Sequence, residues 1–215
     1  MPRSYKVKEA FLTLQGEGAQ TGLPAVFCRF TGCNLWSGRD QDRAHSICTF
    51  CDTDFVGTDG VNGGRFDSAE ALASHLRALW DEKVKVGGQP MIVFTGGEPA
   101  LQLDDALIQS CHARGFKLSI ETNGTLALPK NLDWVCVSPK SDAPLRVTHG
   151  NELKLVFPQP DCQPETVSHL PFDHYFLQPM DGPNAAQNLK ASIEYCLQHP
   201  QWRLSIQTHK LIGID

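Results

Sequence analysis

The stretch Met91-Ile92-Val93-Phe94-Thr95-Gly96-Gly97-Glu98-Pro99 joins an apolar run to a turn with two adjacent glycines. The apolar run predicts a short buried strand over 91–94. Two glycines let the backbone approach a ligand closely, and Pro99 removes a donor and stiffens the exit. The carboxyl end of a parallel strand is where such sheets bind ligands. The same residues also fit a plain strand-to-helix turn, so this stretch alone leaves both interpretations open.

Similar apolar stretches alternate with amphipathic ones along the chain. Further strands are predicted over 25–30, 117–120, 134–137, 152–157, 174–177 and 202–206. Helices are predicted from a capping pattern at Asp67-x-x-Glu70 to about Trp80, over 103–114 with Gly115 as its stop, and over 184–198. In the last helix one face carries Ala185, Leu189, Ile193 and Cys196/Leu197.

This alternation favours an α/β fold with a parallel sheet. The few long helices do not suffice for a closed eightfold barrel. We therefore expect a partial, open parallel β/α barrel in a single domain spanning 1–215. A polar stretch over about 31–64 would form an extended loop, and loops of such length in compact domains are usually functional or disordered.

Three cysteines of that loop, Cys33, Cys48 and Cys51, form a Cys-x14-Cys-x2-Cys pattern. Thiolates of this kind suit an iron–sulfur cluster, which normally takes four Cys ligands, so three would leave one iron open to a reactant. The spacing also allows structural zinc with His45 as a fourth ligand, or three unliganded thiols. Spacing favours the cluster without excluding the other two.

Composition restricts the remaining function classes. The chain of 215 residues has a formal net charge of −5 and no block rich in Lys and Arg, which argues against a general nucleic-acid binder. No apolar run has the length of a signal-peptide core or a membrane span. The other cysteines sit singly and read as free buried thiols, so a cytoplasmic location is expected. They are Cys28, Cys111, Cys136, Cys162 and Cys196.

The cysteine triad, Phe50 between its last two members, and the Gly-Gly-Glu-Pro turn together resemble the radical S-adenosylmethionine enzymes. That family usually spaces its cysteines Cys-x3-Cys-x2-Cys, so the longer first gap is a departure. The departure resembles the 7-carboxy-7-deazaguanine synthase subgroup, whose cluster loops are often longer. Further motifs fit that subgroup in order, namely 12–18 (LTLQGEG), Arg29, 51–53 (CDT), 121–124 (ETNG), 138–140 (SPK), 178–181 (QPMD) and 207–210 (QTHK).

The resemblance implies a role for each matching position. Cys33, Cys48 and Cys51 would ligate a [4Fe–4S] cluster, and Thr53 would bind Mg2+. S-adenosylmethionine would be held by Phe50, Gly97, Ser138, Pro139, Lys140, Gln178, Pro179, Met180 and Asp181. A pterin substrate would contact Leu14, Gln15, Gly16, Glu17, Arg29, Thr95, Glu121 and the terminal carboxylate of Asp215. The role of His209 stays open.

The implied reaction is the radical conversion of 6-carboxy-5,6,7,8-tetrahydropterin to 7-carboxy-7-deazaguanine with loss of ammonia, in queuosine and deazapurine biosynthesis. No side chain is expected to act as a catalytic acid or base, because the radical does the chemistry. A reductase such as flavodoxin or ferredoxin is the expected partner, and a homodimer the expected assembly. The alternatives are a glycyl-radical-enzyme activase of the same superfamily and a non-enzymatic Cys-rich metal-binding module.

Overall fold

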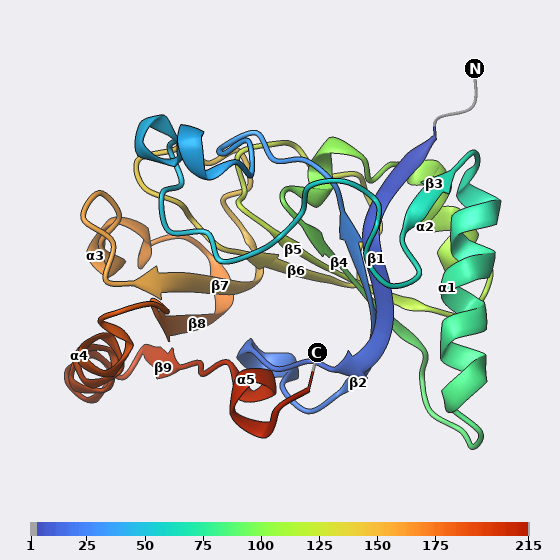
Figure 1. Cartoon of the computed structure of the whole chain (residues 1–215). Coiled ribbons are helices and arrows are strands. Elements are labelled where there is room, and N and C mark those ends of the chain that lie inside the picture. Colours follow the sequence, from blue (N-terminus) through green and yellow to red (C-terminus); the bar gives the residue numbers. More distant parts are fainter. Residues whose placement is uncertain (1–3, 215) are drawn as a thin grey trace.

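The computed structural model describes residues 4–214 and contains an open nine-stranded sheet in the order β3-β1-β2-β4-β5-β6-β7-β8-β9 (Figure 1). Its strands are β1 (Tyr5–Leu14), β2 (Pro24–Phe30), β3 (Gly64–Phe66), β4 (Met91–Gly96), β5 (Lys117–Thr122), β6 (Trp134–Val137), β7 (Gly150–Phe157), β8 (Phe172–Pro179) and β9 (Trp202–Leu204). Pairing is parallel from β2 to β9, whereas β1 is antiparallel to both β2 and β3. Strands β3 and β9 form the two edges, so the predicted open barrel is confirmed.

The longest helices cover one face of this sheet. The α-helices are α1 (Ala69–Lys83), α2 (Asp105–His112), α3 (Pro164–Val167), α4 (Ala185–Gln198) and α5 (Thr208–Ile212). Three short 3-10 helices are η1 (Gly18–Gln20), η2 (Asp40–His45) and η3 (Pro99–Leu101). Helices α1 and α2 lie beside β1, β2 and β5, whereas α4 packs on β8 and β9 (Figure 1). Within residues 4–214 no helix combines the length and the apolar character needed to cross a membrane.

Two strands were not predicted from the sequence. Strand β1 buries Tyr5, Val7 and Ala10, and a register shift between Val7 and Glu9 lets Lys8 turn inward as well. This irregularity masks the period-two pattern that identifies a half-buried strand. Strand β3 closes the long loop by pairing with the start of β1.

Two helix boundaries show how local chemistry sets the elements. Helix α1 is capped by Ser68, whose hydroxyl accepts from the backbone N–H of Ala71, so the predicted cap at Asp67 is wrong by one residue. Helix α2 is capped by Asp104 in the same way. Gly115 follows with φ of +79°, a conformation that favours glycine, which confirms it as the stop of this helix.

The apolar core divides into two main clusters. One lies between α1, α2 and strands β1, β2, β4 and β5, and the other lies under β6 to β9. Helix α4 buries Ser192, and of its predicted apolar face Cys196 packs against the second cluster, partly buried. Leu189, Ile193 and Leu197 of that face are exposed, with Leu197 at 78%.

The turn after β4 is held by close backbone packing. Gly96 has φ of +140°, and a Cβ there would lie 2.3 Å from the carbonyl oxygen of Phe30. A Cβ on Gly97 would lie 2.3 Å from the oxygen of Gly32 and 2.8 Å from the Cβ of Cys33. The two glycines therefore allow the turn to pack on the start of the cysteine loop. This contact gives them a structural reason besides the approach of a ligand.

Glu98 of the same turn is fully buried and accepts three hydrogen bonds. Its Oε1 accepts from Thr122 Oγ1 at 2.7 Å and from the N–H of Ala100 at 2.9 Å, and its Oε2 accepts from the N–H of Asn123 at 2.8 Å. Its own N–H donates to the oxygen of Gly32 at 2.9 Å. One side chain thus ties the end of β4 to the end of β5, and its backbone ties both to the cysteine loop.

Replacing Glu98 by Gln should destabilise the fold by about 1–3 kcal/mol, because either orientation of the amide points an N–H at a backbone N–H. Urea unfolding measures this change. The matched control is Glu194→Gln, whose side chain is 60% exposed in a loose 3.9 Å pair with Lys190, and which should stay within about 0.5 kcal/mol of wild type. Equal effects of the two substitutions would show that the buried carboxylate does not hold the turn.

Candidate active site

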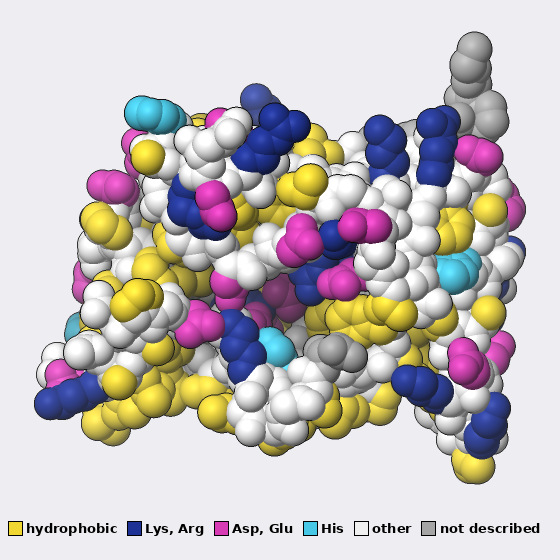
Figure 2. All heavy atoms as spheres, viewed as in Figure 1, with side chains coloured by type: hydrophobic (Ala, Val, Ile, Leu, Met, Phe, Trp, Pro, Cys, Tyr) yellow, Lys and Arg dark blue, Asp and Glu magenta, His cyan; other side chains and the backbone are white. Residues whose placement is uncertain are grey.

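A cavity of about 430 Å³ opens inside the sheet, and its wall includes the residues that end β4, β5 and β8. Figure 2 shows a hollow near the centre of this face, with acidic, basic and histidine side chains around it. The predicted site residues that line the cavity are Leu14, Gln15, Gly16, Glu17, Arg29, Cys48, Phe50, Cys51, Thr53, Thr95, Gly97, Glu121, Ser138, Lys140, Gln178, Pro179, Met180 and Asp181. Segments far apart in the sequence therefore meet at one place.

Three predicted site residues are absent from this lining. Cys33 lies directly behind it, against Gly97. Pro139 is buried, and its carbonyl accepts from Gln159 Nε2 at 3.2 Å. Asp215 lies outside the described residues, so the predicted role of its carboxylate stays a prediction.

Two of the three loop cysteines, Cys48 and Cys51, line the cavity, and Cys33 lies behind its wall. Cys48 and Cys51 are hydrogen-bonded to each other, which raises the pKa of Cys48 and lowers the pKa of Cys51 to about 6. Burial raises the pKa of Cys33, whose Sγ accepts from the N–H of Leu35 at 3.4 Å. All eight cysteines are free of disulfides. Among residues 4–214 no group of three or more His, Cys, Asp or Glu is placed to hold a single metal ion.

This donor set fits a cluster better than a single ion. Cys48 and Cys51 line the cavity and Cys33 lies behind it against Gly97, so this part of the site offers sulfur ligands, which is the ligand type of iron–sulfur clusters. His45, the fourth ligand of the zinc alternative, belongs to η2 and does not line the cavity. The donor type therefore fits an iron–sulfur cluster, and the role of the three cysteines as its ligands stays a prediction.

Next to the thiols lie the segments predicted to hold S-adenosylmethionine. Lys140 donates to Ser138 Oγ, and its ammonium lies 5.9 Å from the ring centroid of Phe50. Asp181 Oδ2 accepts from Lys210 Nζ at 2.5 Å, and the same ammonium lies 2.8 Å from Asp52 Oδ2. Lys210 thus links α5 to the cysteine loop and to the end of β8.

A cation stands on the β2 wall of the cavity. Arg29 pairs across the sheet with Glu9 of β1 and with Thr95 of β4. Its Nε donates to Glu9 Oε1 at 2.8 Å, and both side chains are partly exposed to the cavity. Because Glu9 takes the Nε edge, the terminal guanidinium nitrogens are the part of the fork that suits a carboxylate from a ligand.

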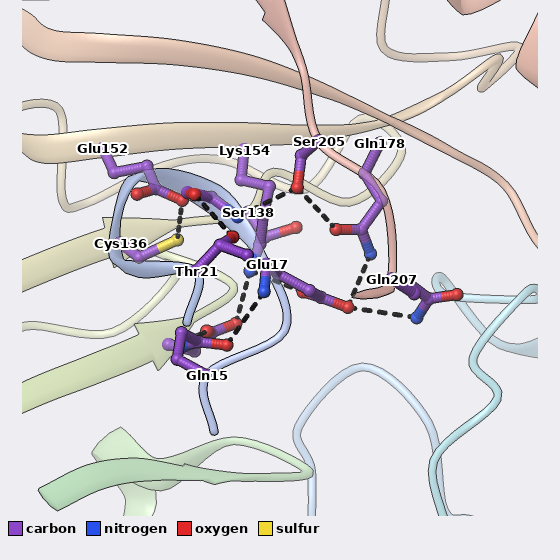
Figure 3. A network of polar contacts seen from close by, with 12 residues as sticks. Gln15, Glu17, Thr21, Cys136, Ser138, Glu152, Lys154, Gln178, Ser205 and Gln207 are labelled. Carbon is purple, nitrogen blue, oxygen red and sulfur yellow. Dashed lines mark hydrogen bonds and ion pairs between the residues drawn. The ribbon is translucent and has the colours of Figure 1, made fainter. Parts of the chain in front are cut away.

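Two carboxylates meet around one buried amine on the β5 and β7 side (Figure 3). Lys154 Nζ lies 2.6 Å from Glu17 Oε2 and 2.7 Å from Glu121 Oε2. Burial alone raises the pKa of Glu17, but the charge and hydrogen bond of Lys154 outweigh it and bring this pKa down to about 2. Gln15 Nε2 donates to Glu121 Oε1 at 2.9 Å. The cavity thus has a basic wall at β2 and an acceptor-rich wall here.

Several residues of this site were missed in the sequence. Lys154 sits in the middle of a predicted strand, where its alternation with leucines favours a solvent-facing position. Only its contact with Glu17, 137 residues away, reveals its place. Glu9 was missed because β1 was missed. His209, whose role was left open, lines the cavity and lies against Gly16, where a Cβ would meet its Nδ1 at 2.2 Å.

Comparisons with known proteins agree with this geometry. No family model matches the sequence. A curated 7-carboxy-7-deazaguanine synthase from Bordetella pertussis is 62% identical over 211 residues, covering 98% of this chain and 99% of that protein. One from Caulobacter vibrioides is 60% identical over 213 residues, with 98% and 99% covered.

A solved structure resembles this chain as well. The crystal structure of QueE from Escherichia coli matches with a TM-score of 0.70 and 28% identity, over 96% of this chain and 95% of that one. The similarity therefore extends over almost the whole chain in both sequence and fold. The chain belongs to the 7-carboxy-7-deazaguanine synthase family.

Proposed function

We propose that this chain is a radical S-adenosylmethionine enzyme that converts 6-carboxy-5,6,7,8-tetrahydropterin to 7-carboxy-7-deazaguanine with loss of ammonia, as a step of queuosine-type biosynthesis. One observation carries the proposal. A single cavity joins two of the thiols and a glycine turn, with the third thiol behind that turn, to a basic wall at Arg29 and an acceptor wall at Glu17 and Glu121. The reaction needs a cluster site beside a pocket that has a cation for the substrate carboxylate and acceptors for the ring N–H groups.

The chain's first task in this proposal is to hold the cofactors. Cys33, Cys48 and Cys51 would ligate a [4Fe–4S] cluster, and S-adenosylmethionine would lie between Phe50, Gly97 and the 138–140 and 178–181 segments. When bound and reduced, these groups supply a radical that abstracts hydrogen from C6 of the substrate. The support for this arrangement is that Ser138, Lys140 and the 178–181 segment line the same cavity as Cys48 and Cys51.

The second task is to orient the substrate. Arg29 would receive the carboxylate of the pterin on its guanidinium fork, and Glu17 and Glu121 would accept the N–H groups of the ring. Leu14, Gln15, Gly16, Thr95 and the carboxylate of Asp215 would complete the pocket. The opposed walls of the cavity support one orientation of a substrate that is acidic at one end and rich in donors at the other.

The third task is to exclude water from a reactive intermediate. The cysteine loop is fastened over the cavity by Lys8, whose Nζ lies 2.8 Å from Asp54, 2.8 Å from Asp59 and 2.9 Å from the oxygen of Val56. Lys210 fastens α5 to the same loop at Asp52. We propose that these ties keep the pocket closed, and that an electron reaches the cluster from a small reductase such as flavodoxin or ferredoxin in the cytoplasm.

The proposal is tested by anaerobic reconstitution of the cluster, reduction, and mass spectrometry of the products. With S-adenosylmethionine and the carboxypterin present, we expect 5′-deoxyadenosine and 7-carboxy-7-deazaguanine. A glycyl-radical activase would instead consume S-adenosylmethionine only with a protein substrate, and a non-enzymatic metal-binding module would form neither product.

Arg29→Ala should weaken binding of the carboxypterin by about 10- to 100-fold and leave binding of S-adenosylmethionine unchanged, because it removes a charged hydrogen-bond partner of one ligand only. Anaerobic titration calorimetry with each ligand measures both. Arg65→Ala, which removes a guanidinium that is 65% exposed beside Asp67, is the matched control. Equal losses for both ligands would remove Arg29 from the substrate site.

Thr53 is proposed to give its hydroxyl to a Mg2+ that also contacts the substrate. The support is its place on the cavity wall, two residues after Cys51, and the preference of Mg2+ for oxygen ligands with retained waters. Thr53→Ala should abolish the stimulation of turnover by Mg2+, and Thr53→Ser should retain it. The same response to Mg2+ in all three proteins would rule out this role.

A homodimer is proposed from the exposed apolar face of α4. Leu189, Ile193 and Leu197 recur there at helical spacing beside β9, an edge strand of the described sheet. A second copy would cover this face. Sedimentation velocity should show a dimer that Ile193→Glu dissociates, whereas Val86→Glu, at a position 91% exposed elsewhere, should not. A monomeric wild-type protein would refute the assembly.

A further inference from the structure

The most unusual charge in the cavity belongs to Lys154. It lies on β7, where Leu153 and Leu155 point into the apolar core and Glu152 and Lys154 point to the opposite face. Its side chain is only 3% exposed. A buried lysine is rare, and a buried ion pair does not by itself stabilise a fold relative to apolar residues of similar size. Its presence therefore suggests a task at the site.

Lys154 contacts two carboxylates, those of Glu17 and Glu121, which together form the carboxylate pair. Glu17 follows β1 and Glu121 lies on β5, so the ammonium joins elements from opposite parts of the sheet. The second oxygen of each carboxylate is also held. Glu17 Oε1 accepts from Gln178 Nε2 at 3.0 Å and from Gln207 Nε2 at 3.0 Å (Figure 3). Together with the Gln15 bond to Glu121, these contacts fix both carboxylate planes.

The groups around Lys154 keep it charged. Burial disfavours the ammonium, but Glu121 and Glu17 outweigh that effect and raise its pKa well above the ordinary value. Cys136 and Glu152 also face it, and burial raises the pKa of both. His209 is the further titratable group that acts on Glu17. The carboxylate pair thus lies beside an ammonium that stays protonated, and its ionised oxygens can only accept hydrogen bonds.

We propose that Lys154 is a positioning residue that holds Glu17 and Glu121 side by side as ionised acceptors, and so restricts the pocket to a ring edge that presents adjacent N–H donors. The inference rests on the proposed function. A ring with oxo groups at that edge would set acceptor against acceptor, which sites of this kind reject strongly. Without the ammonium, the two neighbouring carboxylates would share a proton. One of their oxygens would then become a donor, and the site would no longer present acceptors only.

The test is equilibrium binding of the carboxypterin to reconstituted protein with S-adenosylmethionine present, without reduction, at several pH values between about 5.5 and 8.5. Wild-type affinity should not vary with pH over this range. Lys154→Met should bind about 10- to 100-fold more weakly and gain a pH dependence, with affinity rising as the shared proton leaves. Binding of S-adenosylmethionine should not change.

Two further variants separate positioning from packing. Lys154→Arg keeps the charge and should restore a flat pH profile even if the affinity is reduced. Lys190→Met makes the same chemical change as Lys154→Met at a side chain that is 79% exposed, and should behave as wild type. If Lys154→Met does not fold, judged by circular dichroism, the double variant Lys154→Met/Glu17→Gln removes the ammonium and one of its two carboxylates. It should bind the carboxypterin at least about 10-fold more weakly than wild type, and more weakly than Glu17→Gln alone.

Four outcomes would overturn the inference. Wild-type affinity with a flat pH profile in Lys154→Met, or wild-type affinity in the double variant, would refute the positioning role and leave the proposed function intact. A wild-type protein that binds no carboxypterin would refute the proposed function and this inference with it. A 2-oxo analogue of the pterin that binds wild type as tightly as the 2-amino compound would contradict the proposed selection of a donor edge.

Discussion

The carboxylate of Glu98 joins three parts of the chain that are far apart in the sequence. It receives donors from the η3 turn and from the end of β5, while its backbone reaches the start of the cysteine loop. Beyond it, Asn123 Nδ2 donates to Asn34 Oδ1 at 3.0 Å, and Asn34 Nδ2 donates to Thr125 Oγ1 at 2.8 Å. A buried carboxylate left without partners is strongly destabilising, so these contacts must form together. The wall that carries the thiols takes its position from them.

A second set of constraints lies on two other walls of the cavity. Arg29 stands on β2 with Glu9 across the strand, and Lys154 stands on β7 between Glu17 and Glu121. Each cation is paired with carboxylates inside the protein, so neither wall depends on a ligand to be satisfied. Along each parallel strand, side chains alternate between the apolar core on one face of the sheet and the cavity on the other. The sheet therefore brings both walls to one cavity. The two walls of opposite polarity are thus consistent with the family to which the comparisons assign the chain.

Much of the fold follows from local sequence patterns, and most of the site from motifs. The strand at 134–137 was predicted with its observed bounds, because a continuous apolar run between turn residues has few other solutions. Strand β1 was missed because its bulge at Lys8 breaks the alternation. Lys154 was missed for a different reason. Its neighbours in sequence are ordinary strand residues, and its ion pairs are with Glu17 and Glu121, which approach it only when the sheet is formed.

In the proposed function, the cavity places C6 of the carboxypterin next to the end of S-adenosylmethionine that forms the radical. The most direct measurement uses substrate carrying deuterium at C6, incubated anaerobically with the reduced, reconstituted protein. We expect the deuterium to appear in 5′-deoxyadenosine, as measured by mass spectrometry. Formation of 7-carboxy-7-deazaguanine without deuterium in either 5′-deoxyadenosine or recovered S-adenosylmethionine would contradict this placement.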